Sequence, residues 1–279
     1  MNKKDERVFS LEFIRVSAML AVIAIHGSAG FIEFPPMFAL NQVCRFAVPV
    51  FIILSGIGLR QSSYRQVYTK LPRLLIPYLF WCIIYESFLR PHLYFTVILA
   101  QLYFLYPLLL IAVEKYPIRT FTVSLFISLI CNSLIFLSYF GLDLYPEPLR
   151  PYLWFLFPTW LVYFTGGLLI TPRCLQALSA YAARHLRFLI ITTAICAVYY
   201  VWEAAITGSF YDAIKPSLLI YAPLVIVTFL GLSKIVADIP AFKKLTRYLA
   251  GYSETIYYAH VIVLIFIQKC FFMERPPFP

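Results

Sequence analysis

The chain of 279 residues is 62% hydrophobic and only 13% charged, and its formal net charge is +10. Apolar segments long enough to cross a bilayer recur from one end to the other, so the composition excludes a soluble fold and predicts an integral membrane protein. The basic residues are scattered over the N-terminus and several separate loops, and this scatter argues against nucleic acid as a partner.

We expect an all-α, polytopic helix bundle that forms a single transmembrane domain over residues 1–279. Lysine and arginine are concentrated in the loops that share a side with the N-terminus, which is typical of cytoplasmic loops. The N-terminus is therefore expected in the cytoplasm, and an odd number of spans places the C-terminus outside. The nine expected spans are 11–30, 44–60, 71–90, 93–113, 119–140, 151–171, 187–207, 216–236 and 250–270.

The first expected span contains an arginine and a histidine in an otherwise apolar segment. On an α-helix, Arg15 and His26 come within roughly 20° of one another and lie about 16 Å apart along the axis. An ionisable group in hydrocarbon costs roughly 2.5 kcal/mol or more, so such groups usually face a bundle interior or a water-filled path. The pair therefore indicates a functional site. The alternatives are an arginine that reaches the membrane surface and an ordinary packed histidine.

The end of the second span and the start of the third carry the next candidates. Ser55 and Gly56 place a hydroxyl and a bare backbone where either a ligand or another helix can approach closely. Lys70 and Arg73 are spaced i, i+3, so on a helix they project together and can bind phosphate, the arginine through a bidentate fork. Ordinary anchoring by positive charge on the cytoplasmic side is the alternative for this pair.

His260, in the last expected span, is a second intramembrane histidine. Two histidines in two helices can share one cavity, and a histidine hydrogen-bonded to a neighbouring helix is the alternative. The six cysteines lie in or at the edges of apolar spans and show neither a CxxC pair nor a Cys/His ligand spacing. We interpret them as packing residues and expect no metal site.

Several of these features, taken in chain order, resemble the membrane acyltransferase-three family. The YFLYPLL and YLWF segments are most similar to its bacterial surface-polysaccharide branch, which includes poly-N-acetylglucosamine O-acyltransferase and export-type proteins. The resemblance runs over nearly the whole chain. The segments that carry it are Glu12-x-x-Arg15 with His26, VPVFIILSG at 48–56, KLPRLLIPYLFW at 70–81, HLYFTVILAQLYFLYPLL at 92–109, YLWFLFPTWLVYFTGGLL at 152–169 and SETIYYAH at 253–260.

The resemblance implies a multi-pass protein of the bacterial inner membrane that transfers an acyl group, usually acetyl. The donor is a cytoplasmic acyl-CoA, used as co-substrate without a metal, and the acceptor is a hydroxyl of a cell-surface polysaccharide or lipid-linked sugar. Expected partners are membrane lipids, the glycan acceptor and proteins of polysaccharide synthesis or export. Members of the family typically have ten spans, so the chain either has nine spans or lacks a further loop and closing span.

The resemblance also implies site residues. The essential arginine and histidine of the family fall on Arg15 and His26, and its basic pair falls on Lys70 and Arg73, with lysine in place of the first arginine. We expect His26 to act as general base or acyl relay, and Arg15, held by Glu12, to stabilise negative charge on the thioester oxygen.

We expect Lys70 and Arg73, together with Ser55 and Gly56, to bind coenzyme A, and His260 to be a second histidine of the site. The alternative function from another class is an exporter or flippase for polysaccharide or lipid-linked sugar that forms no bond. Broken spans and buried charges suit both functions, but the sequence shows no inverted repeat, which argues against a transporter.

Overall fold

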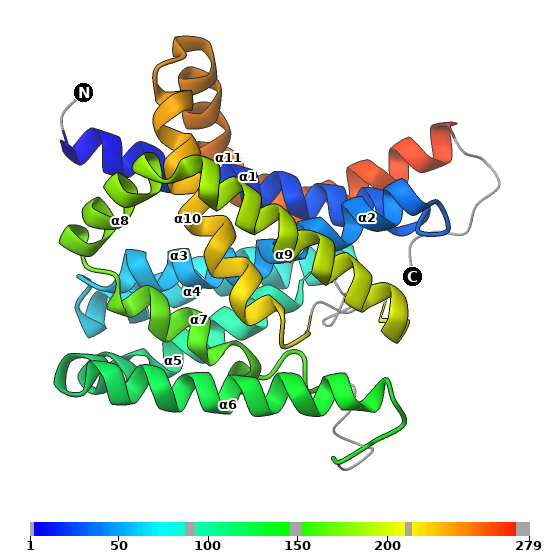
Figure 1. Ribbon diagram of the computed structural model, residues 1–279, viewed down its shortest axis with the longest axis horizontal. Coiled ribbons are helices and arrows are strands. Elements are labelled where there is room, and N and C mark those ends of the chain that lie inside the picture. The colour runs from blue at the N-terminus through cyan, green and yellow to red at the C-terminus, as the bar shows by residue number, and fades with distance from the viewer. Residues whose placement is uncertain (1–2, 87–92, 146–151, 210–213, 272–279) are drawn as a thin grey trace. The chain divides into compact units, whose positions relative to one another are not determined.

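The computed structural model describes residues 3–86, 93–145, 152–209 and 214–271, and its regular elements in these ranges are all helices. The all-α bundle expected from the sequence is therefore confirmed. In chain order the elements are α1 (Lys3–Ala29), α2 (Pro35–Val43), the 3-10 turn η1 (Cys44–Phe46), α3 (Ala47–Leu59), α4 (Tyr64–Ile84), α5 (Tyr94–Lys115), α6 (Pro117–Ser138), α7 (Phe157–Leu169), α8 (Pro172–Arg184), α9 (Leu186–Thr207), α10 (Leu218–Ala237) and α11 (Pro240–Phe271) (Figure 1).

Eight segments of the described chain are long and apolar enough to cross a membrane, and α7 with α8 makes a ninth if the two form one bent span. The second span begins at Pro35, earlier than expected, because α2, η1 and α3 follow one another without a loop. The sixth expected span, 151–171, is represented by α7, which has only 13 residues. Helix α8 was not expected.

The chain divides into two compact units. The first unit comprises Met1–Val50, Pro172–Ala213 and Ser217–Pro279, and the second comprises Phe51–Thr171 and Ile214–Pro216. The boundary falls inside α3, so one continuous helix belongs to both units. The single transmembrane domain expected from the sequence stays a prediction, as does the cytoplasmic N-terminus.

In the first unit, contacts between side chains give the direction of each helix relative to α1. Lys234 Nζ of α10 lies 3.2 Å from Glu6 Oε1, and Phe229 packs edge-on against Phe13. Later residues of α1 thus meet earlier residues of α10, so the two helices are antiparallel.

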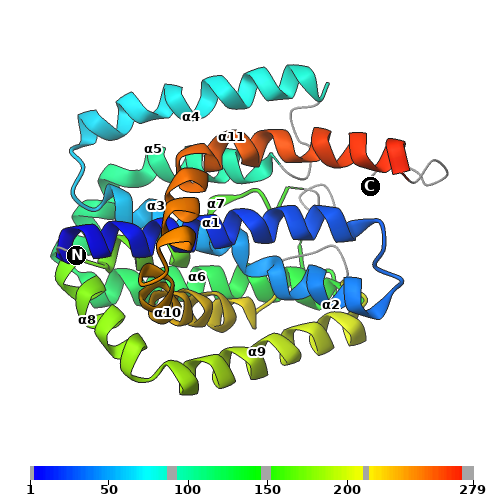
Figure 2. The ribbon, with the colours of Figure 1, turned by 90° about the horizontal axis from the view of Figure 1, so that it is seen from above.

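Helix α11 runs in the opposite sense to α10 (Figure 2). Arg247 Nε lies 3.8 Å from Glu12 Oε2, and farther along both helices the ring of His260 contacts the ring of His26. Later residues of α1 thus meet later residues of α11, so these two helices are parallel.

The directions of α10 and α11 bear on the number of membrane crossings. Consecutive spans cross a membrane in alternating directions, so without a crossing at α7 and α8 the last described helix would be the eighth span and antiparallel to α1. It is parallel, and α10 is antiparallel, as expected for the ninth and eighth of nine spans. The fold therefore favours nine crossings, the number expected from the sequence.

In the second unit, polar side chains satisfy backbone groups at the start of α7. Gln101 of α5 accepts a hydrogen bond from the Phe157 backbone N–H (3.1 Å) and donates one to the Phe155 carbonyl (2.8 Å). Asn132 of α6 donates to the Thr159 carbonyl at 3.2 Å. The first backbone N–H groups of a helix have no partner within the helix, and in hydrocarbon an unsatisfied group is costly. These contacts allow α7 to begin inside the bundle.

Helices α3 and α7 touch through two glycines. A Cβ at Gly56 would lie 2.5 Å from the Phe164 carbonyl oxygen and 2.9 Å from the Cα of Gly167, and a Cβ at Gly167 would collide with the Ile53 carbonyl. Backbones approach this closely only where small residues line both helices, which is how membrane helices gain packing energy. Gly56 therefore serves helix packing, which was one of its two readings from the sequence.

We expect Gly56→Ala to destabilise the protein by about 1–3 kcal/mol, because the added methyl group meets backbone atoms that cannot rotate away. Gly58 lies on the same helix with open space around its Cα, so Gly58→Ala is the matched control and should be neutral or stabilising by up to about 1 kcal/mol. The thermal unfolding midpoints of both variants in one detergent provide the measurement. Equal midpoints would contradict the packing role.

Candidate active site

Two histidines from the first and last described helices meet in the first unit. The ring centroids of His26 and His260 are 5.1 Å apart and the rings are tilted by 46°. His260 is 4% exposed, and His26 is half-buried. The structure thus brings together the two residues that the sequence placed in separate spans, and we refer to them as the histidine pair.

The protonation pattern of His260 follows from its backbone contact. Its Nδ1 lies 2.6 Å from the Tyr257 carbonyl oxygen, which can only accept a hydrogen bond. Nδ1 therefore carries a proton, and in the neutral ring Nε2 holds the lone pair. This contact also fixes the ring orientation within α11.

The spacing of the histidine pair limits its charge. Two positive charges about 5 Å apart repel by roughly 3 kcal/mol at an effective dielectric constant of about 20. The pair is therefore expected to carry at most one added proton at a time. A proton taken up at His26 would face a neutral imidazole rather than a second cation.

Arg15 and Glu12 do not form the contact expected from the sequence. The carboxylate of Glu12 faces α11, where its nearest recorded cation is Arg247 at 3.8 Å, and its buried Oε2 accepts no hydrogen bond from the described residues. Arg247 also donates to Asp5 at 3.1 Å. The Arg15 side chain is exposed and makes no recorded ion pair or hydrogen bond within the described part of the chain. Their catalytic roles stay predictions.

An amide next to the histidine pair was missed by sequence reasoning. The fully buried Asn41 of α2 donates to the Ile25 carbonyl at 2.8 Å and to Ser28 Oγ at 3.1 Å, on either side of His26 in α1. Its Oδ1 accepts two bonds from Arg45, at 3.1 Å from Nε and 2.7 Å from Nη2. This network, which we call the amide bridge, joins α2 to the turn of α1 that carries His26. The i, i+4 spacing of an amide and an arginine in an apolar segment was the available signal.

The basic pair lies in the second unit, on α4. Ser63 and Gln66 form a capping box that begins the helix. Lys70 is half-buried and its Nζ donates to Ser62 Oγ at 3.3 Å, whereas Arg73, one turn on, is exposed. The pair is thus accessible about two to three turns into α4 rather than at its start, and this position suits either phosphate binding or anchoring.

A side chain of α5 holds the turn between α3 and α4 in place through hydrogen bonds. The Tyr106 hydroxyl lies 2.8 Å from the Leu59 carbonyl oxygen and 2.6 Å from the Ser62 carbonyl oxygen. These bonds hold the segment onto which Lys70 folds. Ser55, also in this unit, is half-buried. Its expected contact with coenzyme A stays a prediction.

The architecture described above is that of a multi-pass membrane protein with ionisable side chains between its helices. Residues 8–90 match the family model of an acyltransferase domain, the acyltransferase-three domain. This confirms over those residues the family expected from the motifs, and the matched stretch includes Glu12, Arg15, His26, Lys70 and Arg73. Comparison with curated proteins and with solved structures finds no significant match. Within the described residues, no group of three or more His, Cys, Asp or Glu side chains could hold a metal ion.

We expect Asn41→Leu to lower stability by about 2 kcal/mol or more, because it leaves the buried Ile25 carbonyl and the Arg45 guanidinium without a bond that each makes. Ser28→Ala removes only one acceptor of the amide bridge and should cost about 1 kcal/mol. Thermal unfolding of the purified variants tests this order. An Asn41→Leu protein as stable as the wild type would show that the bridge does not hold α1.

Proposed function

We propose that the protein is an O-acyltransferase of the bacterial inner membrane that moves an acetyl group from cytoplasmic acetyl-CoA to a hydroxyl of a cell-surface polysaccharide or lipid-linked sugar. The observation that carries the proposal is the acyltransferase-domain match across Arg15 and His26. The contact between His26 and His260 inside the first unit supports it, because a lone packed histidine has no need of an ionisable neighbour.

In the proposed reaction His26 is the general base. Its imidazole takes the proton of the acceptor hydroxyl while the hydroxyl oxygen forms a bond to the thioester carbonyl carbon. The carbon–sulfur bond then breaks, the ester stays on the sugar, and the leaving thiolate takes the proton from the imidazolium. The exposed guanidinium of Arg15 would stabilise negative charge on the carbonyl oxygen. His260 would act as a positioning residue that keeps the His26 ring oriented.

The donor site is proposed at the basic pair. Coenzyme A carries several phosphates, and an exposed arginine with a lysine one turn away on α4 suits them. Gly56 packs directly against Gly167, which leaves no room for a ligand at this residue. Of the second span, we therefore propose only Ser55 as a contact for coenzyme A.

His26→Gln should lower acetyl transfer by about 100-fold or more, because an amide cannot shuttle the proton. His260→Gln should lower kcat roughly tenfold and leave the KM for acetyl-CoA unchanged, since it acts through His26. His185, exposed before α9, provides the control, and His185→Gln should keep wild-type rates. The assay follows radiolabelled acetyl-CoA with a bacterial glycan fraction and the purified protein in nanodiscs.

Wild-type transfer by a folded His26→Gln protein would end the assignment of His26 as base. If the wild-type protein neither consumes nor binds acetyl-CoA under these conditions, the exporter without bond-forming activity becomes the better function. A His260→Gln protein that loses thermal stability and transfer in parallel would show a packing role for His260.

Replacing Lys70 or Arg73 by glutamine should raise the KM for acetyl-CoA more than it lowers kcat, because phosphate contacts are made equally in the ground and transition states. Lys70→Arg should keep or tighten donor binding, since a fork replaces a point charge. Arg65, exposed on the same helix, is the matched control, and Arg65→Gln should leave the KM unchanged. Coenzyme A affinity measured by calorimetry decides the matter, and unchanged affinity in both glutamine variants would leave membrane anchoring as the role of the pair.

A further inference from the structure

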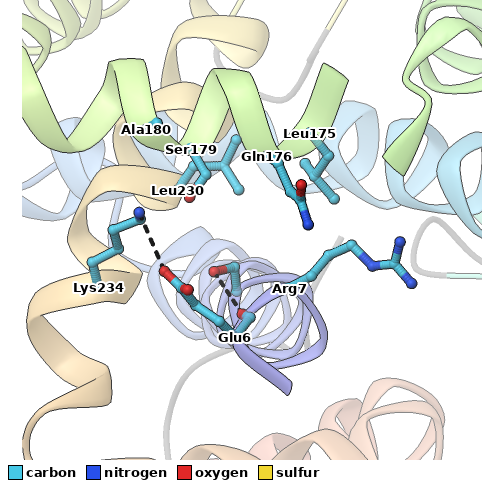
Figure 3. Close-up of a pocket in the computed structure, with 9 residues that line it drawn as sticks. Glu6, Arg7, Leu175, Gln176, Ser179, Ala180, Leu230 and Lys234 are labelled. Atoms are coloured by element: carbon cyan, nitrogen blue, oxygen red, sulfur yellow. Dashed lines mark hydrogen bonds and ion pairs between the residues drawn. The ribbon is translucent and has the colours of Figure 1, made fainter. Parts of the chain in front are cut away.

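The first unit contains a cavity of about 250 Å³ where the first turns of α1, helix α8 and the last turns of α10 meet (Figure 3). Its charged and polar lining comes from Glu6, Arg7 and Ser10 of α1, Gln176 and Ser179 of α8, and Lys234 of α10. We refer to these six residues as the α8 pocket. The histidine pair and the basic pair are not part of this lining.

The α8 pocket carries one uncompensated positive charge. Lys234 is paired with Glu6 at 3.2 Å, and both side chains are about one-third exposed to solvent, at 33% and 37%. Arg7 makes no recorded ion pair or hydrogen bond, and within the described residues the side chains of Gln176 and Ser179 have no recorded partner either. In the view of Figure 3, Gln176 and the Arg7 guanidinium lie on the side away from Lys234. A guanidinium, an amide and a hydroxyl are thus available as donors to one anion.

The size of the cavity limits what it holds. Pockets for drug-sized ligands have volumes of about 300–1,000 Å³, so a cavity of about 250 Å³ suits a small polar group rather than a whole coenzyme A. A phosphodiester carries one negative charge and matches the single excess positive charge of the α8 pocket. Leu175 and Leu230 are buried and add apolar surface to the lining, so only its polar side chains can hold an anion.

The position of α8 indicates where this anion comes from. Helix α8 buries Leu175 and Ala182 on one face and exposes Arg173 and Arg184 at its ends, the pattern of a helix that lies at a membrane surface. The pocket also lies where α1 begins and α10 ends, which is where spans meet the headgroup region, on the side expected to be cytoplasmic. Basic pockets between spans on the cytoplasmic side are typical binding places for anionic lipid headgroups.

We propose that the α8 pocket binds the phosphodiester headgroup of an anionic phospholipid, with Arg7, Gln176 and Ser179 as donors. The Lys234–Glu6 pair closes the other side of the site and keeps its net charge at one. This site is independent of acyl transfer, so its test does not depend on the proposed function.

The test measures binding of short-chain phosphatidylglycerol to the full chain in a neutral detergent. Arg7→Gln should weaken binding roughly tenfold or more, because it removes a charge-assisted bond to phosphate. Arg173→Gln, on α8 outside the pocket, removes the same charge and should change affinity less than about twofold. Glu6→Gln frees Lys234 from its pair and should tighten binding about two- to fivefold.

Each other outcome overturns the proposal. Equal losses in Arg7→Gln and Arg173→Gln would mean that surface charge alone attracts the lipid. Glycerol phosphate that competes as well as phosphatidylglycerol would identify a soluble phosphate as the ligand. Short-chain phosphatidylcholine that binds equally well would exclude recognition of net negative charge. Weaker rather than tighter binding by a stably folded Glu6→Gln protein would show that the ion pair, not the free arginine, makes the site.

Discussion

The cost of an ionisable side chain in hydrocarbon is the constraint on which the first unit depends. Helix α1 brings Glu12, Arg15 and His26 into a span, and each must be compensated by a neighbour, by water or by the membrane surface. Helix α11 places Arg247 beside Glu12 and His260 beside His26. The parallel packing of the two helices follows from these pairings, and through it the crossing count does as well.

The two groups of candidate site residues belong to different units, and α3 is the element they share. The amide bridge fixes the segment just before α3 to α1, beside His26. The contact of Gly56 with Gly167 fixes the other end of α3 to α7. Helix α3 therefore begins in the unit of the histidine pair and ends in the unit of the basic pair.

Hydropathy predicted four of the nine spans, those of α5, α6, α9 and α10, to within about two residues at both ends, because a helix in lipid must be about twenty residues long and apolar. It failed at α8, whose apolar residues form a stripe too short to span, and at the start of the second span, where α2 extends the helix before η1. Hydropathy along the chain does not predict which residues of distant helices come into contact. The partner of Glu12 is Arg247 on a distant helix rather than Arg15 one turn away, and nothing local distinguishes these two arginines. Likewise Gly56 suited a ligand or a helix until the position of Gly167 was known.

The pairing of the first described helix with the last one has a consequence for biosynthesis. At about 5–20 residues per second, a ribosome needs on the order of tens of seconds between releasing α1 and releasing α11. During that interval His26 and Glu12 reside in the bilayer before His260 and Arg247 have been made. A chain whose synthesis stops before α11 therefore keeps uncompensated polar groups in lipid. Membrane quality control can recognise such groups. Only a chain translated through α11 can pair them.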